Sequence, residues 1–125
     1  MLKTISTKKA PAAIGPYSQA ISEGNLIFCS GQLGMDPESG AMKEGIEAQT
    51  EQVLKNLSEV LKEAGSDMSH VVKTTVYLTD LNDFAIMNAV YEKAFGGHKP
   101  ARATIPVSNL PKNALVEIDA IAVKL

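Results

Sequence analysis

The segment Ile46–Ala64 constrains the fold most, because its pattern fits only one kind of element. Residues of largely apolar character recur in it at steps of three and four, the spacing of one helical face; they are Ile46, Thr50, Val53, Leu54, Leu57, Val60, Leu61 and Ala64. Charged and amide side chains fill the other face, and Gly65 is suited to end the helix. The segment therefore predicts an amphipathic helix that needs an apolar partner surface.

The partner surface is predicted to be a β-sheet, because short apolar runs and alternating patterns flank the helix on both sides. The predicted strands are 2–7, 18–22, 26–30, 70–79, 102–107 and 115–123. A second helix is predicted over 84–95, after the cap candidates Asp80–Asp83 and before Gly96. This order predicts an α+β fold, a mixed sheet of about five or six strands with two helices packed on one face.

The second face of this sheet also carries apolar side chains. Ile27, Tyr77, Ile121 and Val123 make their strands apolar on both faces, and two helices cover only one. A large apolar face is not left in water. Another copy of the same chain is the economical cover, so we predict a homo-oligomer whose sheets face inward.

Length and charge set the class of protein. The 125 residues fit a single domain, 1–125, and the net charge of -2 without any run of like charge weighs against nucleic-acid binding. The lone Cys29 excludes an intramolecular disulfide and reads as a small buried hydrophobe.

Cofactor and membrane signals are missing from the sequence. His70 and His98 have no metal-like spacing, and the glycines form no nucleotide-binding loop, so we expect neither a metal nor another cofactor. No apolar stretch would span a bilayer and no signal-peptide layout is visible, so we expect a cytoplasmic protein without a membrane partner.

Arg102 and Glu117 are the candidates for chemistry, because both are charged and lie between apolar segments. One interpretation is a structural ion pair that holds two strands together. The other is that Arg102 binds a substrate carboxylate with its planar guanidinium, while Glu117 acts as a base toward water. The residues alone leave both interpretations open.

Polar groups at two further places could orient a small substrate. Tyr17 follows a Gly-Pro turn, and Ser30 and Gly31 stand where the strand 26–30 is expected to end. Asn88 lies on the apolar stripe of the second helix, where a core amide bonded to backbone is favoured over a contact with a ligand or a neighbouring subunit.

Six segments together resemble the RidA (YjgF/YER057c/UK114) family over essentially the whole chain. They are KPAR at 99–102, Leu110-Pro111, VEIDAIAV at 116–123, IGPYSQA at 14–20, FCSGQLG at 28–34 and TTVYLTD at 74–80. The resemblance implies a chorismate-mutase-like fold and a homotrimer with active sites in the clefts between subunits.

The resemblance also implies an activity that needs no cofactor. Members hydrolyse reactive 2-imino acids and their enamine tautomers, such as 2-iminopropanoate and 2-iminobutanoate, to 2-keto acids and ammonia. These compounds arise from pyridoxal-phosphate-dependent dehydratases. The preferred imino acid is left open. The alternatives are an endoribonuclease, as some relatives are named, and a non-catalytic module that binds a small carboxylate.

Individual roles follow from the same resemblance. Arg102 would grip the substrate carboxylate, and Glu117 would position and deprotonate the attacking water. The pocket would be completed by Tyr17, Ser30, Phe84, Asn88, the backbone at Gly31 and Gln32, and the backbone N–H at Thr104. Many members carry a cysteine at the position of Thr104, so thiol-dependent behaviour is not expected here.

Overall fold

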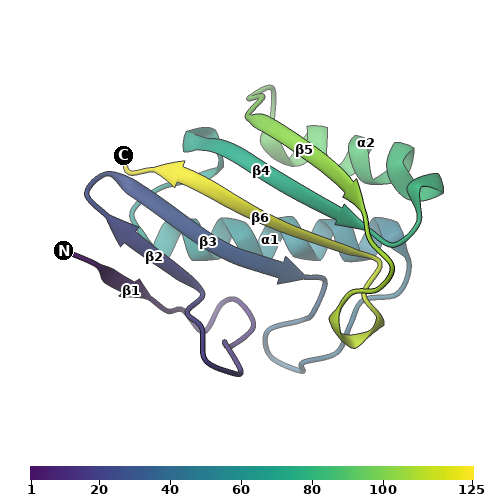
Figure 1. Ribbon diagram of the computed structural model, residues 1–125, viewed down its shortest axis with the longest axis horizontal. Coiled ribbons are helices and arrows are strands. Elements are labelled where there is room, and N and C mark those ends of the chain that lie inside the picture. Colours follow the sequence, from purple (N-terminus) through teal and green to yellow (C-terminus); the bar gives the residue numbers. More distant parts are fainter.

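A computed structural model describes residues 1–125 and contains one six-stranded sheet with two α-helices. The elements in chain order are β1 (Lys3–Ile5), β2 (Ala20–Glu23), β3 (Leu26–Leu33), α1 (Ile46–Glu63), η1 (Met68–His70), β4 (Val71–Leu78), η2 (Leu81–Asp83), α2 (Phe84–Phe95), β5 (Ala101–Pro106), η3 (Pro111–Asn113) and β6 (Val116–Val123), where η marks a 3-10 turn. The strand order is β1-β2-β3-β6-β4-β5, and among neighbouring strands only β4 and β5 pair in parallel (Figure 1).

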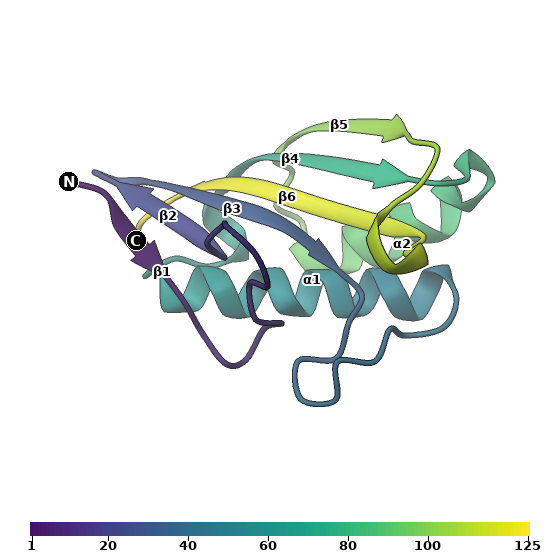
Figure 2. The same ribbon diagram turned by 60° about the horizontal axis from the view of Figure 1, so that its bottom comes forward.

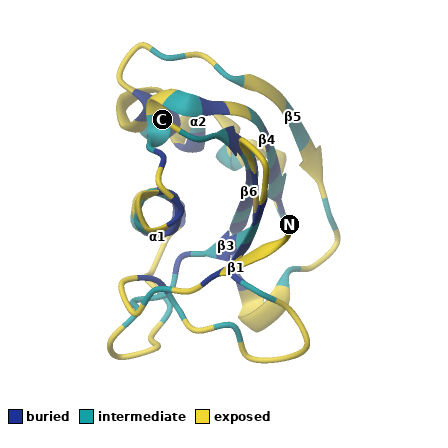
Figure 3. Ribbon diagram, turned by 90° about the vertical axis from the view of Figure 1, so that its left-hand side faces the viewer, coloured by how far each residue is buried: buried dark blue, intermediate teal, exposed yellow.

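Both helices lie on the same face of the sheet (Figures 2 and 3). The connection between the parallel strands β4 and β5 must cross over the sheet, and α2 makes that crossover. The predicted α+β architecture with two helices on one face is confirmed. Neither helix has the length and apolar character needed to cross a membrane.

The amphipathic pattern of α1 translates directly into burial. Val53, Leu57, Val60 and Leu61 are fully buried against the sheet. Full burial of such side chains contributes about 1.5–3 kcal/mol each. The helix ends at Glu63 with Ala64 as its C-cap, and the predicted terminator Gly65 follows with a φ of 84°, a conformation that side-chain-bearing residues rarely adopt.

The partner of α1 is the inward face of β6 and its neighbours. Val116, Ile118, Ala120 and Ala122 alternate along β6 and are at most 2% exposed, as the period of two predicts. Figure 3 shows buried stretches along β6, with α1 and α2 both on one side of the sheet. The core of the protein is therefore a single layer between one sheet face and two helices.

Two strand predictions were wrong in the same way. The strand 26–30 was expected to end at Ser30, but β3 continues to Leu33 through a β-bulge between Cys29 and Gln32. Strict alternation over 70–79 predicts Val72 on the same face as Thr74 and Val76, but an irregularity in β4 between Val71 and Lys73 turns Val72 outward and places Val71 in the core. One extra residue flips the alternation without ending the strand.

The sheet face opposite the helices, called the open face below, has no cover within the chain. Leu26, Phe28, Val72 and Ile105 are each between 41% and 44% exposed. Such clustered apolar exposure is typical of a surface that binds a partner. The predicted homo-oligomer remains a prediction.

The end of β3 passes so close to α1 that only glycine fits at position 34. A Cβ there would lie 2.7 Å from the Cα of Gln49 in the helix backbone. We expect Gly34→Ala to lower the free energy of unfolding by about 1–3 kcal/mol, because the helix backbone must move. Denaturant unfolding at fixed protein concentration measures this free energy. Glu38→Ala, at an exposed position, is the control. Equal free energies of unfolding for the two variants would contradict the close contact between Gly34 and α1.

Candidate active site

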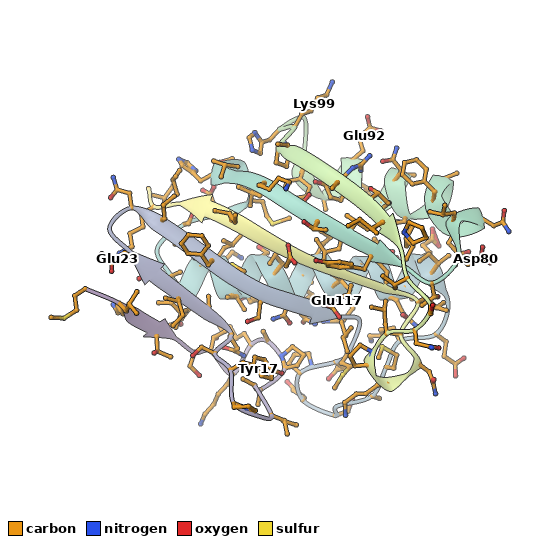
Figure 4. All side chains as sticks on the ribbon, viewed as in Figure 1. Tyr17, Glu23, Asp80, Glu92, Lys99 and Glu117 are labelled. Carbon is orange, nitrogen blue, oxygen red and sulfur yellow. The ribbon has the colours of Figure 1, made fainter.

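A cleft of about 480 Å³ opens on the open face around the carboxylate of Glu117. Figure 4 shows Glu117 near the ends of β3 and β6, with Tyr17 on the neighbouring N-terminal loop. The cleft is lined by Pro11, Ala12, Ile14, Tyr17, Gln19, Ser30, Gly31, Gln32, Leu33, Met35, Pro111, Lys112 and Glu117. The structure thus brings together five of the predicted site residues: Tyr17, Ser30, Gly31, Gln32 and Glu117.

The bulge of β3 forms the floor beneath this carboxylate. A Cβ on Gly31 would lie 2.8 Å from Cδ of Glu117, so the carboxylate can occupy this place only because residue 31 is glycine. The Ser30 hydroxyl donates to the carbonyl of Ser18 at 2.6 Å, and the Ser30 N–H donates to the carbonyl of Gln19 at 3.0 Å. The Ser30 oxygen therefore keeps its lone pairs for an N–H or O–H donor in the cleft.

Burial raises the pKa of Glu117, and the nearby negative charge of Asp119 raises it further. Asp119 lies two residues along the same face of β6 and accepts a hydrogen bond from the Tyr77 hydroxyl at 3.1 Å. A carboxylate with a raised pKa is a stronger proton acceptor near neutral pH. Glu117 also binds its proton more tightly in the folded protein than in the unfolded chain. Protonated Glu117 therefore stabilises the fold at acid pH, and this contribution is lost as the pH rises through the raised pKa.

Arg102 belongs to a different surface, on the helix side of the sheet. Its register partner Thr74 faces α2 and shares a hydrogen bond of 2.7 Å with the Tyr91 hydroxyl, which fixes the direction of this face. The Arg102 guanidinium donates to Oδ1 of Asn88 at 2.7 Å. It lies 4.8 Å from the ring centroid of Tyr91 and 5.6 Å from that of Phe84. Three side chains of α2 thus hold the guanidinium in place.

The guanidinium is exposed and has no carboxylate partner in the chain. One guanidinium N–H of Arg102 is bonded to Asn88, and the remaining N–H groups include a pair that can bind a planar anion such as a carboxylate. The interpretation of Asn88 as a core amide bonded to backbone was wrong. Its oxygen is bonded to Arg102, because the outward edge of the α2 stripe meets the edge strand β5.

The proposed structural ion pair between Arg102 and Glu117 is absent. Glu117 is a register partner of Tyr77, which points to the open face, whereas Arg102 points to the helix face. The strand β4 also separates β5 from β6. One chain therefore cannot bring both groups to one small substrate.

Thr104 lies two residues after Arg102 on the same strand. Its hydroxyl oxygen is buried without a hydrogen-bond partner. Cys29 is also buried, and burial raises the pKa of its thiol to about 12, with a smaller contribution from Asp119. The thiol is therefore protonated at neutral pH, consistent with the prediction of a small hydrophobe.

Sequence reasoning missed two parts of the site. Tyr91 was not among the predicted site residues, although its spacing of three from Asn88 places both beneath Arg102. The apolar wall of the cleft, formed by Pro11, Ala12 and Ile14, gave no periodic signal because it is a loop. A wider groove of about 570 Å³ between α1 and α2 contains none of the predicted site residues.

Comparison with known proteins agrees with this fold. A family model described as endoribonuclease L-PSP matches residues 7–124. The 2-iminobutanoate/2-iminopropanoate deaminase of Mus musculus is 54% identical over 98% of this chain and 91% of that protein. RidA from the Antarctic bacterium Psychrobacter sp. has a crystal structure that matches with a TM-score of 0.95 at 48% identity, covering 97% and 98% of the two chains.

A crystal structure of E. coli TdcF with bound serine matches with a TM-score of 0.95 at 40% identity, over 98% of this chain and 99% of that one. Fold and sequence thus define a protein of the RidA type. The chain belongs to the endoribonuclease L-PSP family, and the predicted RidA relationship is confirmed.

Removal of the charge on Asp119 should change the titration of Glu117. In Asp119→Asn we expect a lower pKa for Glu117 than in the wild type, because the repulsion that opposes its ionisation is gone. NMR titration of the Glu117 side-chain carboxyl carbon measures the pKa directly. Asp80→Asn, at an exposed position, should leave the Glu117 pKa unchanged. An unchanged Glu117 pKa in Asp119→Asn would refute the charge of Asp119 as a cause of the raised pKa.

Proposed function

We propose that this chain hydrolyses reactive 2-imino acids and their enamine tautomers to 2-keto acids and ammonia. The observation that carries the proposal is the Arg102 guanidinium, held by Asn88, Tyr91 and Phe84 with free donors facing outward. This is a receptor for a small carboxylate. Full-length similarity to proteins named 2-iminobutanoate/2-iminopropanoate deaminase supplies the reaction.

The active unit in this proposal is a homotrimer. Each cleft would combine the Glu117 side of one subunit with the Arg102 side of its neighbour. Support comes from the opposite orientations of the two side chains and from the uncovered apolar open face. Such a head-to-tail contact closes into a ring when the rotation between subunits allows it.

In the proposed mechanism Arg102 binds the carboxylate of the substrate and fixes the imine carbon near Glu117. Glu117 takes a proton from a water molecule while the water oxygen forms a bond to that carbon, and the C=N bond becomes a single bond. The imine nitrogen ends up carrying the proton from Glu117. In the resulting carbinolamine Glu117 takes the hydroxyl proton and passes it to the amino nitrogen, the C–N bond breaks, and ammonia leaves as the keto group forms.

Hydrolysis of an imine needs only modest catalysis by the protein. An imine carbon is already electrophilic, so positioning by Arg102 and one general base suffice, the latter accounting for about 10²–10⁴-fold. The Ser30 oxygen, which can only accept, is suited to an N–H of the substrate. Tyr17, the backbone at Gly31 and Gln32, and the N–H of Thr104 are proposed to complete the pocket, and no cofactor takes part.

Neither alternative function gains support from the geometry. The cleft contains one cation, Lys112, and one anion, Glu117, which is not the basic groove that binds RNA. A pure carboxylate-binding module would need Arg102 but has no use for a half-buried base such as Glu117. The expected cytoplasmic location remains a prediction.

The first experiment measures trapping of imine generated in place. An amino-acid oxidase supplies 2-iminopropanoate, and semicarbazide traps whatever imine is not hydrolysed. We expect the wild-type protein to suppress semicarbazone formation, and Arg102→Ala and Glu117→Gln each to lower kcat/KM by at least about 100-fold. Exposed Lys99→Ala is the control that should retain activity; unchanged trapping with the wild type would end the deaminase proposal.

Mixed oligomers test the shared site. Arg102→Ala and Glu117→Gln proteins are unfolded together in equal amounts and refolded. Clefts that receive an intact arginine from one subunit and an intact glutamate from the other should restore about a quarter of the wild-type rate. Each variant refolded alone should stay inactive. A mixture as inactive as its components would mean that both residues come from one subunit.

A further inference from the structure

The buried amide of Gln19 holds the N-terminal wall of the cleft by four hydrogen bonds. Gln19 is 3% exposed. Its oxygen accepts from the N–H of Thr7 at 2.7 Å, and its amide nitrogen donates to the carbonyls of Thr7, Ala10 and Pro11 at 3.0, 3.3 and 2.8 Å. This loop has no strand or helix between residues 7 and 17, so the side chain replaces the missing backbone pairing.

The backbone of the same residue is tied to the base of the cleft. The carbonyl of Gln19 accepts from the N–H of Ser30, in the bulge that carries Gly31 beneath Glu117. The preceding carbonyl, that of Ser18, accepts from the Ser30 hydroxyl. Gln19 therefore connects the N-terminal loop with the bulge and fixes the distance between them.

The part of the loop that Gln19 fastens is apolar where it meets the cleft. Pro11, Ala12 and Ile14 form this wall, while Ser30, Gly31 and Glu117 supply polar groups to the lining of the same cleft. A 2-imino acid has three groups on one carbon: a carboxylate, a nitrogen and an alkyl chain. If the nitrogen and water lie beside the polar groups, the alkyl chain is left to the apolar wall.

We infer that Gln19 is a positioning residue for substrate selection: by holding the wall of Pro11, Ala12 and Ile14 against the cleft, it sets the space for the alkyl chain of the imino acid. This inference rests on the proposed deaminase function. Gln19 need not touch the reacting atoms. Gln19 acts through the position of the loop. It therefore affects binding of the substrate's alkyl chain and leaves proton transfer at Glu117 intact.

A purely structural role would give a different kinetic pattern. Loss of folded protein lowers the apparent kcat equally for every substrate and leaves KM unchanged. A displaced wall raises KM and does so more for the substrate with the longer chain, because the lost contacts are with that chain. One methylene in a well-formed pocket is worth about 10–200-fold in discrimination, so the change is large enough to measure.

The test compares two variants with one control. Gln19→Met keeps the length of the side chain and removes all four hydrogen bonds, and Gln19→Glu keeps an acceptor for Thr7 but loses the amide donors. Ser66→Ala is the control, because it removes one buried hydrogen bond, to the carbonyl of Val123, far from the cleft. Steady-state kinetics use 2-iminopropanoate and 2-iminobutanoate, and amide hydrogen exchange follows residues 7–17.

In both Gln19 variants we expect faster amide exchange over residues 7–17 and a kcat within about twofold of the wild type. KM for 2-iminobutanoate should rise at least about fivefold, and KM for 2-iminopropanoate less. Ser66→Ala should change neither KM. Equal changes for both substrates, or a fall in kcat alone, would overturn the inference, whereas an inactive wild type with faster exchange in the variants would overturn the proposed function instead.

Discussion

Two helices can cover only one face of a six-stranded sheet, and the rest of this structure follows from that limit. The apolar stripe of α1 packs on the inward positions of β6, where Val116 and Ile118 are fully buried. The opposite face is left with both apolar side chains and the carboxylates of Glu117 and Asp119. Successive side chains of a strand point to opposite faces of the sheet. One set therefore builds the core, and the other set is available for contacts with another subunit and for chemistry.

The chemistry of the open face is set by local irregularities in a regular sheet. The bulge of β3 places Gly31 under Glu117, and its missing side chain creates the room that the carboxylate fills. Burial and the charge of Asp119 oppose ionisation of that carboxylate, and the Tyr77 hydroxyl partly offsets the charge on Asp119. A group held in this way weakens the fold at neutral pH, which is typical of ionisable groups at functional sites.

Buried amides organise the loops around the cleft. Gln19 fastens the N-terminal loop, and Asn56 of α1 donates to the carbonyls of Leu33 and Met35 where β3 ends. Gln49 accepts from the N–H of Leu115, just before β6. These side chains satisfy backbone groups that no strand pairs, so side-chain hydrogen bonds take the place of strand pairing in the irregular segments beside the cleft.

Periodicity in the sequence determined both helices, the inward face of β6 and the one-sided packing, because the repeats of 3.6 and two residues report which side of an element is apolar. The motifs around Tyr17, Ser30 and Glu117 also located half of the candidate site. Only the tertiary structure decided the bulges, which shift the faces of β3 and β4 by one residue, and the partners of Asn88 and Gln19. It also placed Arg102 and Glu117 on opposite faces of the sheet, because strand order and the direction of a side chain depend on contacts between residues far apart in the chain.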